Sequence, residues 1–86
     1  MKTKAIDFII KTIECKADEV GYNIDENTDY RRMCQIVTDF DYEGNVPTYE
    51  EKVFCAELLE DLCTMVGLRY DLLLDKAIGE YATPQA

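Results

Sequence analysis

Apolar side chains recur at the spacing of an α-helix in four stretches of this chain, and this periodicity constrains the fold more than any other feature. The first stretch has one apolar face, formed by Ile6, Ile9, Ile10, Ile13, Ala17 and Val20. Gly21 follows at the position where a helix commonly ends in a left-handed residue. The second stretch begins near Thr28, a good N-cap residue, and its apolar face contains Tyr30, Met33, Cys34 and Val37. Both stretches therefore predict amphipathic helices.

Two further helices are predicted on either side of Gly67. Thr48 and Glu51 have the spacing of a capping box, which marks the start of a helix. Its apolar face consists of Cys55, Leu58, Leu59, Leu62 and Val66, and we expect Phe54 and Met65 to widen that face. The last stretch carries Tyr70, Leu73, Leu74, Ala77, Ile78 and Tyr81. Short connections between these segments predict an all-α fold, a small bundle of about four short amphipathic helices.

The 86 residues suffice for one domain over residues 1–86, in which we expect residues 82–86 to form a frayed tail.

The secondary structure of one segment is ambiguous. Ile36 and Val37 are β-branched, and Phe40 and Tyr42 alternate with acidic residues, so a short extended piece near 36–42 is an alternative to helix.

Acidic residues dominate the charge of the chain. The formal net charge is −9, from 18 acidic and 9 basic residues. Such a surface repels phosphate groups, which argues against direct binding to nucleic acid or to an anionic membrane and favours a basic protein as partner. Residues 1–38 contain six basic and seven acidic residues, whereas residues 39–86 contain three and eleven. We therefore expect a charge-driven binding surface in the second half.

The four cysteines and the start of the chain indicate a cytoplasmic protein. Cys15, Cys34, Cys55 and Cys63 have no CxxC spacing and fall inside predicted helices, so we expect reduced and partly buried thiols and no zinc site. Charged residues interrupt the apolar stretch that a signal peptide would need, and no apolar run is long enough to span a membrane.

In the twelve residues from Asp39 to Glu50, acidic residues stand at positions 1, 3, 5 and 12, and Gly44 stands at position 6. This pattern resembles the twelve-residue calcium loop of EF-hand proteins. The resemblance implies a ligand set of Asp39, Asp41, Glu43, the carbonyl of Asn45, and Glu50. Pro47, at position 9, departs from the pattern. The alternative interpretation is an acidic loop between helices, and we expect neither a cofactor nor a metal site.

Catalysis finds little support in the sequence, and we expect no enzyme activity. Histidine is absent, which removes the commonest general base near neutral pH. The chain has no glycine-rich phosphate loop and no nucleophile in a recognisable elbow.

The hypothesis that follows is a non-enzymatic inhibitor or regulator that docks a basic, nucleic-acid-binding protein. Carboxylates repeated along a helix can imitate a phosphate backbone, and aromatic side chains beside them can anchor a partner. The candidate binding residues are Asp39, Asp41, Tyr42, Glu43, Tyr49, Glu50, Glu57, Glu60 and Asp61. In size, acidity and lack of catalytic motifs the chain resembles the small inhibitors that phages and mobile elements encode, including anti-CRISPR proteins.

Two alternative hypotheses remain. One is a helical adaptor, or a homodimer that uses apolar residues at the margins of their stripes, such as Val53 and Leu72. The other is a divergent single calcium-binding loop at residues 39–50.

Overall fold

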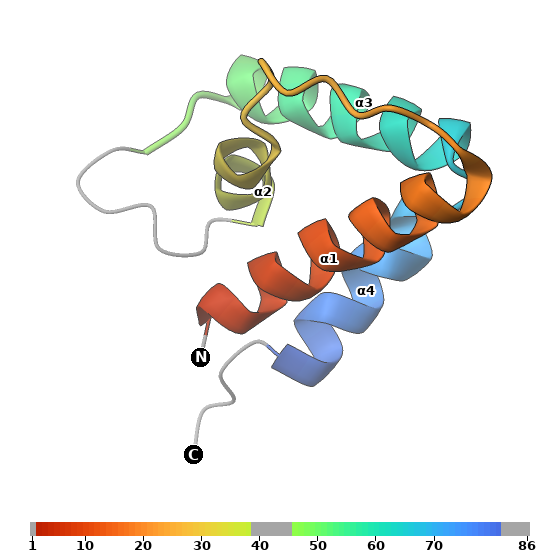
Figure 1. The fold of residues 1–86 in the computed structure, drawn as a ribbon. Helices are drawn as coiled ribbons and strands as arrows, with labels where there is room; N and C mark the ends of the chain where they lie inside the picture. The colour runs from red at the N-terminus through yellow and green to blue at the C-terminus, as the bar shows by residue number, and fades with distance from the viewer. Residues whose placement is uncertain (1, 39–45, 82–86) are drawn as a thin grey trace.

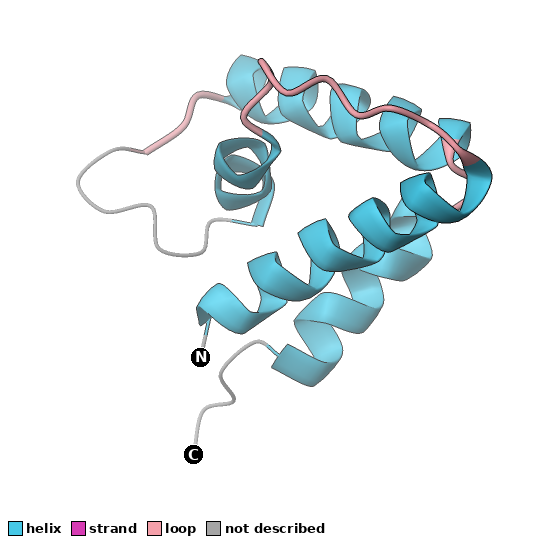
Figure 2. Ribbon diagram, viewed as in Figure 1, coloured by secondary structure: helices cyan, strands magenta, loops and turns pink. Residues whose placement is uncertain are grey.

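The computed structural model describes residues 2–38 and 46–81, and these residues form four α-helices and no strand (Figures 1 and 2). The helices are α1 (Lys2–Val20), α2 (Tyr30–Thr38), α3 (Tyr49–Met65) and α4 (Tyr70–Tyr81). The prediction of a small all-α bundle is confirmed. None of the helices in the described ranges combines the length and the apolar character needed to cross a membrane.

The helices pack as two pairs. α1 lies against α4 in the opposite direction, and α2 lies against α3 (Figure 1). Smaller contacts of α1 with α2 and of α3 with α4 join the two pairs. One hydrophobic cluster at the centre takes side chains from all four helices, with Ile6, Ile9 and Ile13 of α1 almost fully buried. At one end of the bundle the rings of Phe8 and Tyr81 stack with centroids 5.0 Å apart.

A glycine in a left-handed conformation ends α1, and another ends α3. Gly21 and Gly67 have φ of 73° and 81°, a conformation that costs a side-chain-bearing residue energy. Beyond Gly21 the amide of Tyr22 donates to the carbonyl of Ala17 at 2.8 Å, and beyond Gly67 the amide of Leu68 donates to Cys63 at 2.7 Å. Both helices therefore end in a Schellman motif.

The two helix starts differ in how well the sequence predicts them. The capping box is present: the Thr48 hydroxyl accepts from the Glu51 amide, and the Glu51 carboxylate accepts from the Thr48 amide. The start of α2 was predicted one residue early. Asp29 caps this helix, since its carboxylate accepts from the amide of Arg32, while the Thr28 hydroxyl donates to Asp25.

The structure decides the ambiguous segment as far as residue 38, and it contradicts one prediction about α3. Ile36, Val37 and Thr38 are helical, and Ile36 is buried, because packing of α2 against α3 outweighs β-branched propensity. Residues 39–42 of the predicted extended piece lie outside the described residues, as does the predicted tail 82–86. Phe54 and Met65 do not widen the core, and both face solvent.

Replacing glycine by alanine should have opposite effects at two positions that are equally open. A Cβ atom at Gly21 or at Gly79 would meet no atom within 4 Å, but only Gly21 has positive φ. We expect Gly21→Ala to lower the free energy of unfolding by about 1 kcal/mol and Gly79→Ala, within α4, to raise it by about 0.5–1 kcal/mol. Urea denaturation followed by circular dichroism measures both changes. Equal effects of the two substitutions would contradict this account of the turn.

Candidate functional site

The face of α3 that points away from the core carries two neighbouring rows of side chains. Burial of Cys55, Leu59, Leu62 and Cys63 fixes the orientation of the helix. A helical repeat of 3.6 residues then places Glu50, Glu57 and Asp61, which we call the acidic row, at the centre of the outer face. Beside it lie Phe54, Leu58 and Met65, which we call the apolar row. All six side chains are exposed.

The structure separates the predicted site residues on α3 into two groups. Glu50, Glu57 and Asp61 share the acidic row. Tyr49 and Glu60 are also exposed, but the helical repeat places them on the flank of α3 away from the apolar row. The remaining predicted residues, Asp39, Asp41, Tyr42 and Glu43, lie outside the described residues.

The apolar row borders a small groove. The groove has a volume of about 170 Å³, and its walls come from α3 and from the segment 22–30 that runs beside it (Figure 1). From α3 it is lined by Leu58, Asp61, Leu62 and Met65, and from the other wall by Tyr22, Thr28 and Tyr30. The groove therefore combines apolar and aromatic surface with one carboxylate.

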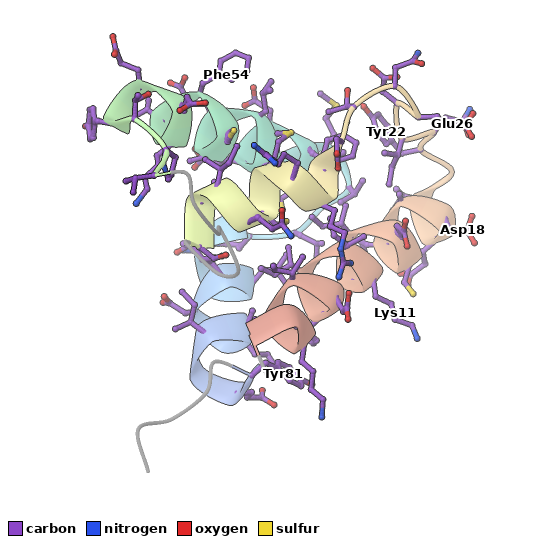
Figure 3. All side chains as sticks on the ribbon, turned by 90° about the vertical axis from the view of Figure 1, so that its left-hand side faces the viewer. Lys11, Asp18, Tyr22, Glu26, Phe54 and Tyr81 are labelled. Atoms are coloured by element: carbon purple, nitrogen blue, oxygen red, sulfur yellow. The ribbon has the colours of Figure 1, made fainter. Side chains whose placement is uncertain are left out.

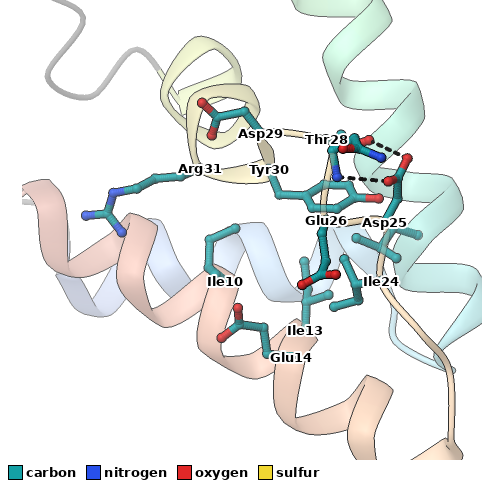
Figure 4. Close-up of a pocket in the computed structure, with 12 residues that line it drawn as sticks. Ile10, Ile13, Glu14, Ile24, Asp25, Glu26, Thr28, Asp29, Tyr30 and Arg31 are labelled. Carbon is teal, nitrogen blue, oxygen red and sulfur yellow. Dashed lines mark hydrogen bonds between the residues drawn. The ribbon is translucent and has the colours of Figure 1, made fainter.

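A larger pocket lies on the other side of Tyr30, between α1 and the same segment (Figure 4). It has a volume of about 570 Å³. Its apolar part is formed by Ile10, Ile13, Ile24 and Leu62, and its acidic part by Glu14, Asp25, Glu26 and Asp29. Arg31, the one basic residue among those that line it, pairs with Asp7 of α1.

The segment 22–30 contributes to both hollows, although the charge distribution along the sequence predicts a binding surface within residues 39–86. It contains three acidic residues and no basic one, a local signal that was hidden by the lysines of α1 in the charge count for residues 1–38. Asp25 stabilises the turn in this segment, because its carboxylate accepts hydrogen bonds from the amide of Asn27 at 2.9 Å and from the Thr28 hydroxyl at 3.1 Å. These hydrogen bonds lower the pKa of Asp25, so this carboxylate is charged at neutral pH.

Three of the four cysteines lie in the core. Cys34, Cys55 and Cys63 are buried and Cys15 is exposed, and all four are free thiols. Burial raises the pKa of Cys34 to about 12 and that of Cys63 to about 11, and it raises the pKa of Cys55 as well. Because the thiolate is the nucleophile, these buried thiols are unreactive near neutral pH. The hydroxyl of Tyr70 is buried and has no hydrogen-bond partner among residues 2–38 and 46–81, and burial raises its pKa too.

The EF-hand-like segment is described only at its end. Pro47 is buried and Glu50 is exposed in the first turn of α3, whereas Asp39, Asp41, Glu43 and Asn45 lie outside the described residues. Within residues 2–38 and 46–81, no three histidine, cysteine or acidic side chains are grouped so that they could hold a metal ion.

Comparison with known proteins gives no match: no family model fits the chain, and no curated protein or solved structure is significantly similar to it.

The burial of the thiols predicts their order of reaction. In the native protein at pH 8, Ellman's reagent should modify Cys15 rapidly, whereas Cys34, Cys55 and Cys63 should react only as the protein unfolds. The absorbance of released thionitrobenzoate at 412 nm should therefore correspond to one fast thiol, and to four in guanidinium chloride. Cys15→Ser should remove the fast phase. A fast phase of two or more thiols in the native protein would contradict the buried positions.

Proposed function

We propose that this protein is a non-enzymatic inhibitor or regulator that binds a basic protein through the outer face of α3. The observation that carries the proposal is the pairing of the acidic row with the apolar row on one exposed helix face. Five acidic residues and one basic residue lie within α3, and all five acidic side chains are exposed. Carboxylates of this density attract a basic surface and set the orientation in which it docks.

The apolar row supports binding rather than simple solubility. A helix face that serves only solubility needs no large apolar side chains, yet Phe54 and Met65 are exposed to solvent beside the carboxylates. Aromatic residues and methionine are enriched where proteins bind one another. The chemistry of the chain supports a non-enzymatic role, since it has no histidine and its three buried thiols are protonated at neutral pH.

The partner we propose is a nucleic-acid-binding protein, whose basic channel the acidic row would occupy in place of phosphates. Residues four apart on a helix are separated by about 6 Å along its axis, so Glu57 and Asp61 present charges in a regular row. Arginine binds carboxylates and phosphates through the same paired hydrogen bonds. Such mimicry is consistent with an anti-defence inhibitor of the kind that phages and mobile elements encode, such as an anti-CRISPR protein.

Neutralising the acidic row should abolish partner capture. Wild-type protein immobilised on resin should retain basic proteins from a bacterial lysate, and they should elute as the salt concentration rises. The triple variant Glu50→Gln, Glu57→Gln and Asp61→Asn should retain at least tenfold less, measured by quantitative mass spectrometry. Added duplex DNA should compete with the wild-type protein for the captured partner.

A charge-matched variant controls for the change in net charge. Asp18→Asn, Glu19→Gln and Asp75→Asn remove three exposed carboxylates from α1 and α4, and this variant should capture the partner as the wild type does. If both variants lose capture equally, the net charge alone determines binding and the proposed face is wrong. Retention of the partner by the acidic-row variant would also contradict the proposal.

A further inference from the structure

We infer that the groove between the apolar row and the segment 22–30 receives an amphipathic basic helix of the partner. This inference rests on the proposed function and adds to it the kind of element that docks. A basic surface could approach a row of carboxylates in any conformation. The groove selects among these conformations, because its apolar lining binds apolar side chains along one line and the carboxylates beside it bind cationic side chains at the margins.

The docked helix needs apolar side chains because α3 exposes large apolar side chains to solvent. Phe54 and Met65 are 60% and 58% exposed, and Leu58 is 37% exposed, although each is large enough to contribute to a core. Phe54 projects from α3 away from α1 and α4 (Figure 3). Phe54, Leu58 and Met65 extend over about three helical turns, and their spacing matches that of apolar residues on an amphipathic helix laid beside them.

The groove supplies a second wall that α3 alone would lack. Tyr22 and Tyr30, both half-buried, line it opposite Leu58 and Met65. Tyr22 is held by the hydrogen bond of its amide to Ala17, and Tyr30 begins α2. Both rings are thus carried on ordered backbone. A rigid aromatic wall facing a flexible methionine is well suited to hold a leucine or isoleucine side chain of a partner.

One carboxylate lines the groove, and a second is bonded to a residue of its opposite wall. Asp61 lines it from α3, and Glu57 lies one turn before Asp61. On the opposite wall the Thr28 hydroxyl, which lines the groove, donates to the Asp25 carboxylate at 3.1 Å. The segment 22–30 has no basic residue that could neutralise this wall. A helix with lysine or arginine on either side of its apolar stripe would place opposite charges along both margins.

Charge also decides against a second copy of this chain as the occupant. A symmetric dimer through the groove would set the acidic row of one protomer beside that of its partner. With five acidic residues and one basic residue in each α3, the two helices would repel one another. A basic helix turns the same carboxylates into favourable contacts.

The test uses a fluorescein-labelled helical peptide of about 18 leucine and lysine residues, with the leucines at i, i+3, i+4 and i+7 spacing. Its control is a peptide of the same composition with scrambled order, and therefore of the same charge. Fluorescence anisotropy in 150 mM salt should show that the full-length protein binds the amphipathic peptide at least tenfold more tightly than the scrambled one.

Matched variants locate the binding. The double variant Phe54→Ser and Met65→Ser should weaken binding of the amphipathic peptide by at least tenfold. Leu72→Ser and Ile78→Ser, which change exposed apolar residues of α4, should leave it unchanged. All four positions are exposed, so both variants should keep the wild-type circular dichroism spectrum and Tm.

Four outcomes would overturn the inference. Equal affinity for the two peptides would leave the proposed acidic face intact but show that no groove selects a helix. Binding of neither peptide would contradict the proposed function as well. Loss of binding in the α4 variant alone would move the site to α4. A homodimer in light scattering that Phe54→Ser and Met65→Ser dissociate would identify a second copy of the chain as the occupant.

Discussion

Burial of one face of α3 against α2 and α4 is the contact on which the rest of the structure depends. α2 packs mainly against α3, and α3 also contacts α4, which in turn lies along α1. Small thiol side chains at Cys34, Cys55 and Cys63 belong to this core, together with Leu59 and Leu62. Because a helix can turn only one face to the core, this packing determines that Phe54 and Asp61 point outward together.

The turn that follows α1 brings a second acidic element beside that face. Gly21 ends α1 in a left-handed conformation, Asp25 closes a short turn through Asn27 and Thr28, and Asp29 caps α2. These local hydrogen bonds let the chain cross from α1 to α2 while running beside α3 (Figure 1). They also place the Asp25 carboxylate beside Thr28, which lines the same groove as Asp61 of α3.

Much of the fold can be predicted from the sequence because its signals are local. A glycine after an apolar stripe, the Thr48–Glu51 capping box and helical periodicity each act within a few residues, and the structure bears them out. The end of α2 was ambiguous for the opposite reason. The β-branched residues Ile36 and Val37 favour extended backbone locally, but the burial of Ile36 and the partial burial of Val37 depend on residues far along the chain.

The candidate site was only partly predictable. Glu57 and Asp61 could be placed on one helix face from their spacing alone. The periodicity could not tell whether Phe54 and Met65 belong to the core, because the apolar stripe of α3 is broader than the surface that α2 and α4 cover. Tyr22, Asp25 and Tyr30 were missed because their position beside α3 is a tertiary contact that no local pattern encodes.

We propose that a basic amphipathic element binds where α3 and the segment 22–30 meet. Amide chemical-shift mapping of ¹⁵N-labelled protein, titrated with the leucine–lysine peptide, tests this location directly. We predict the largest shifts at Tyr22, Tyr30, Phe54, Leu58, Asp61 and Met65, with α1 before residue 18 and the outer face of α4 unchanged. Shifts concentrated on α4, or spread evenly over all acidic residues, would contradict the claim.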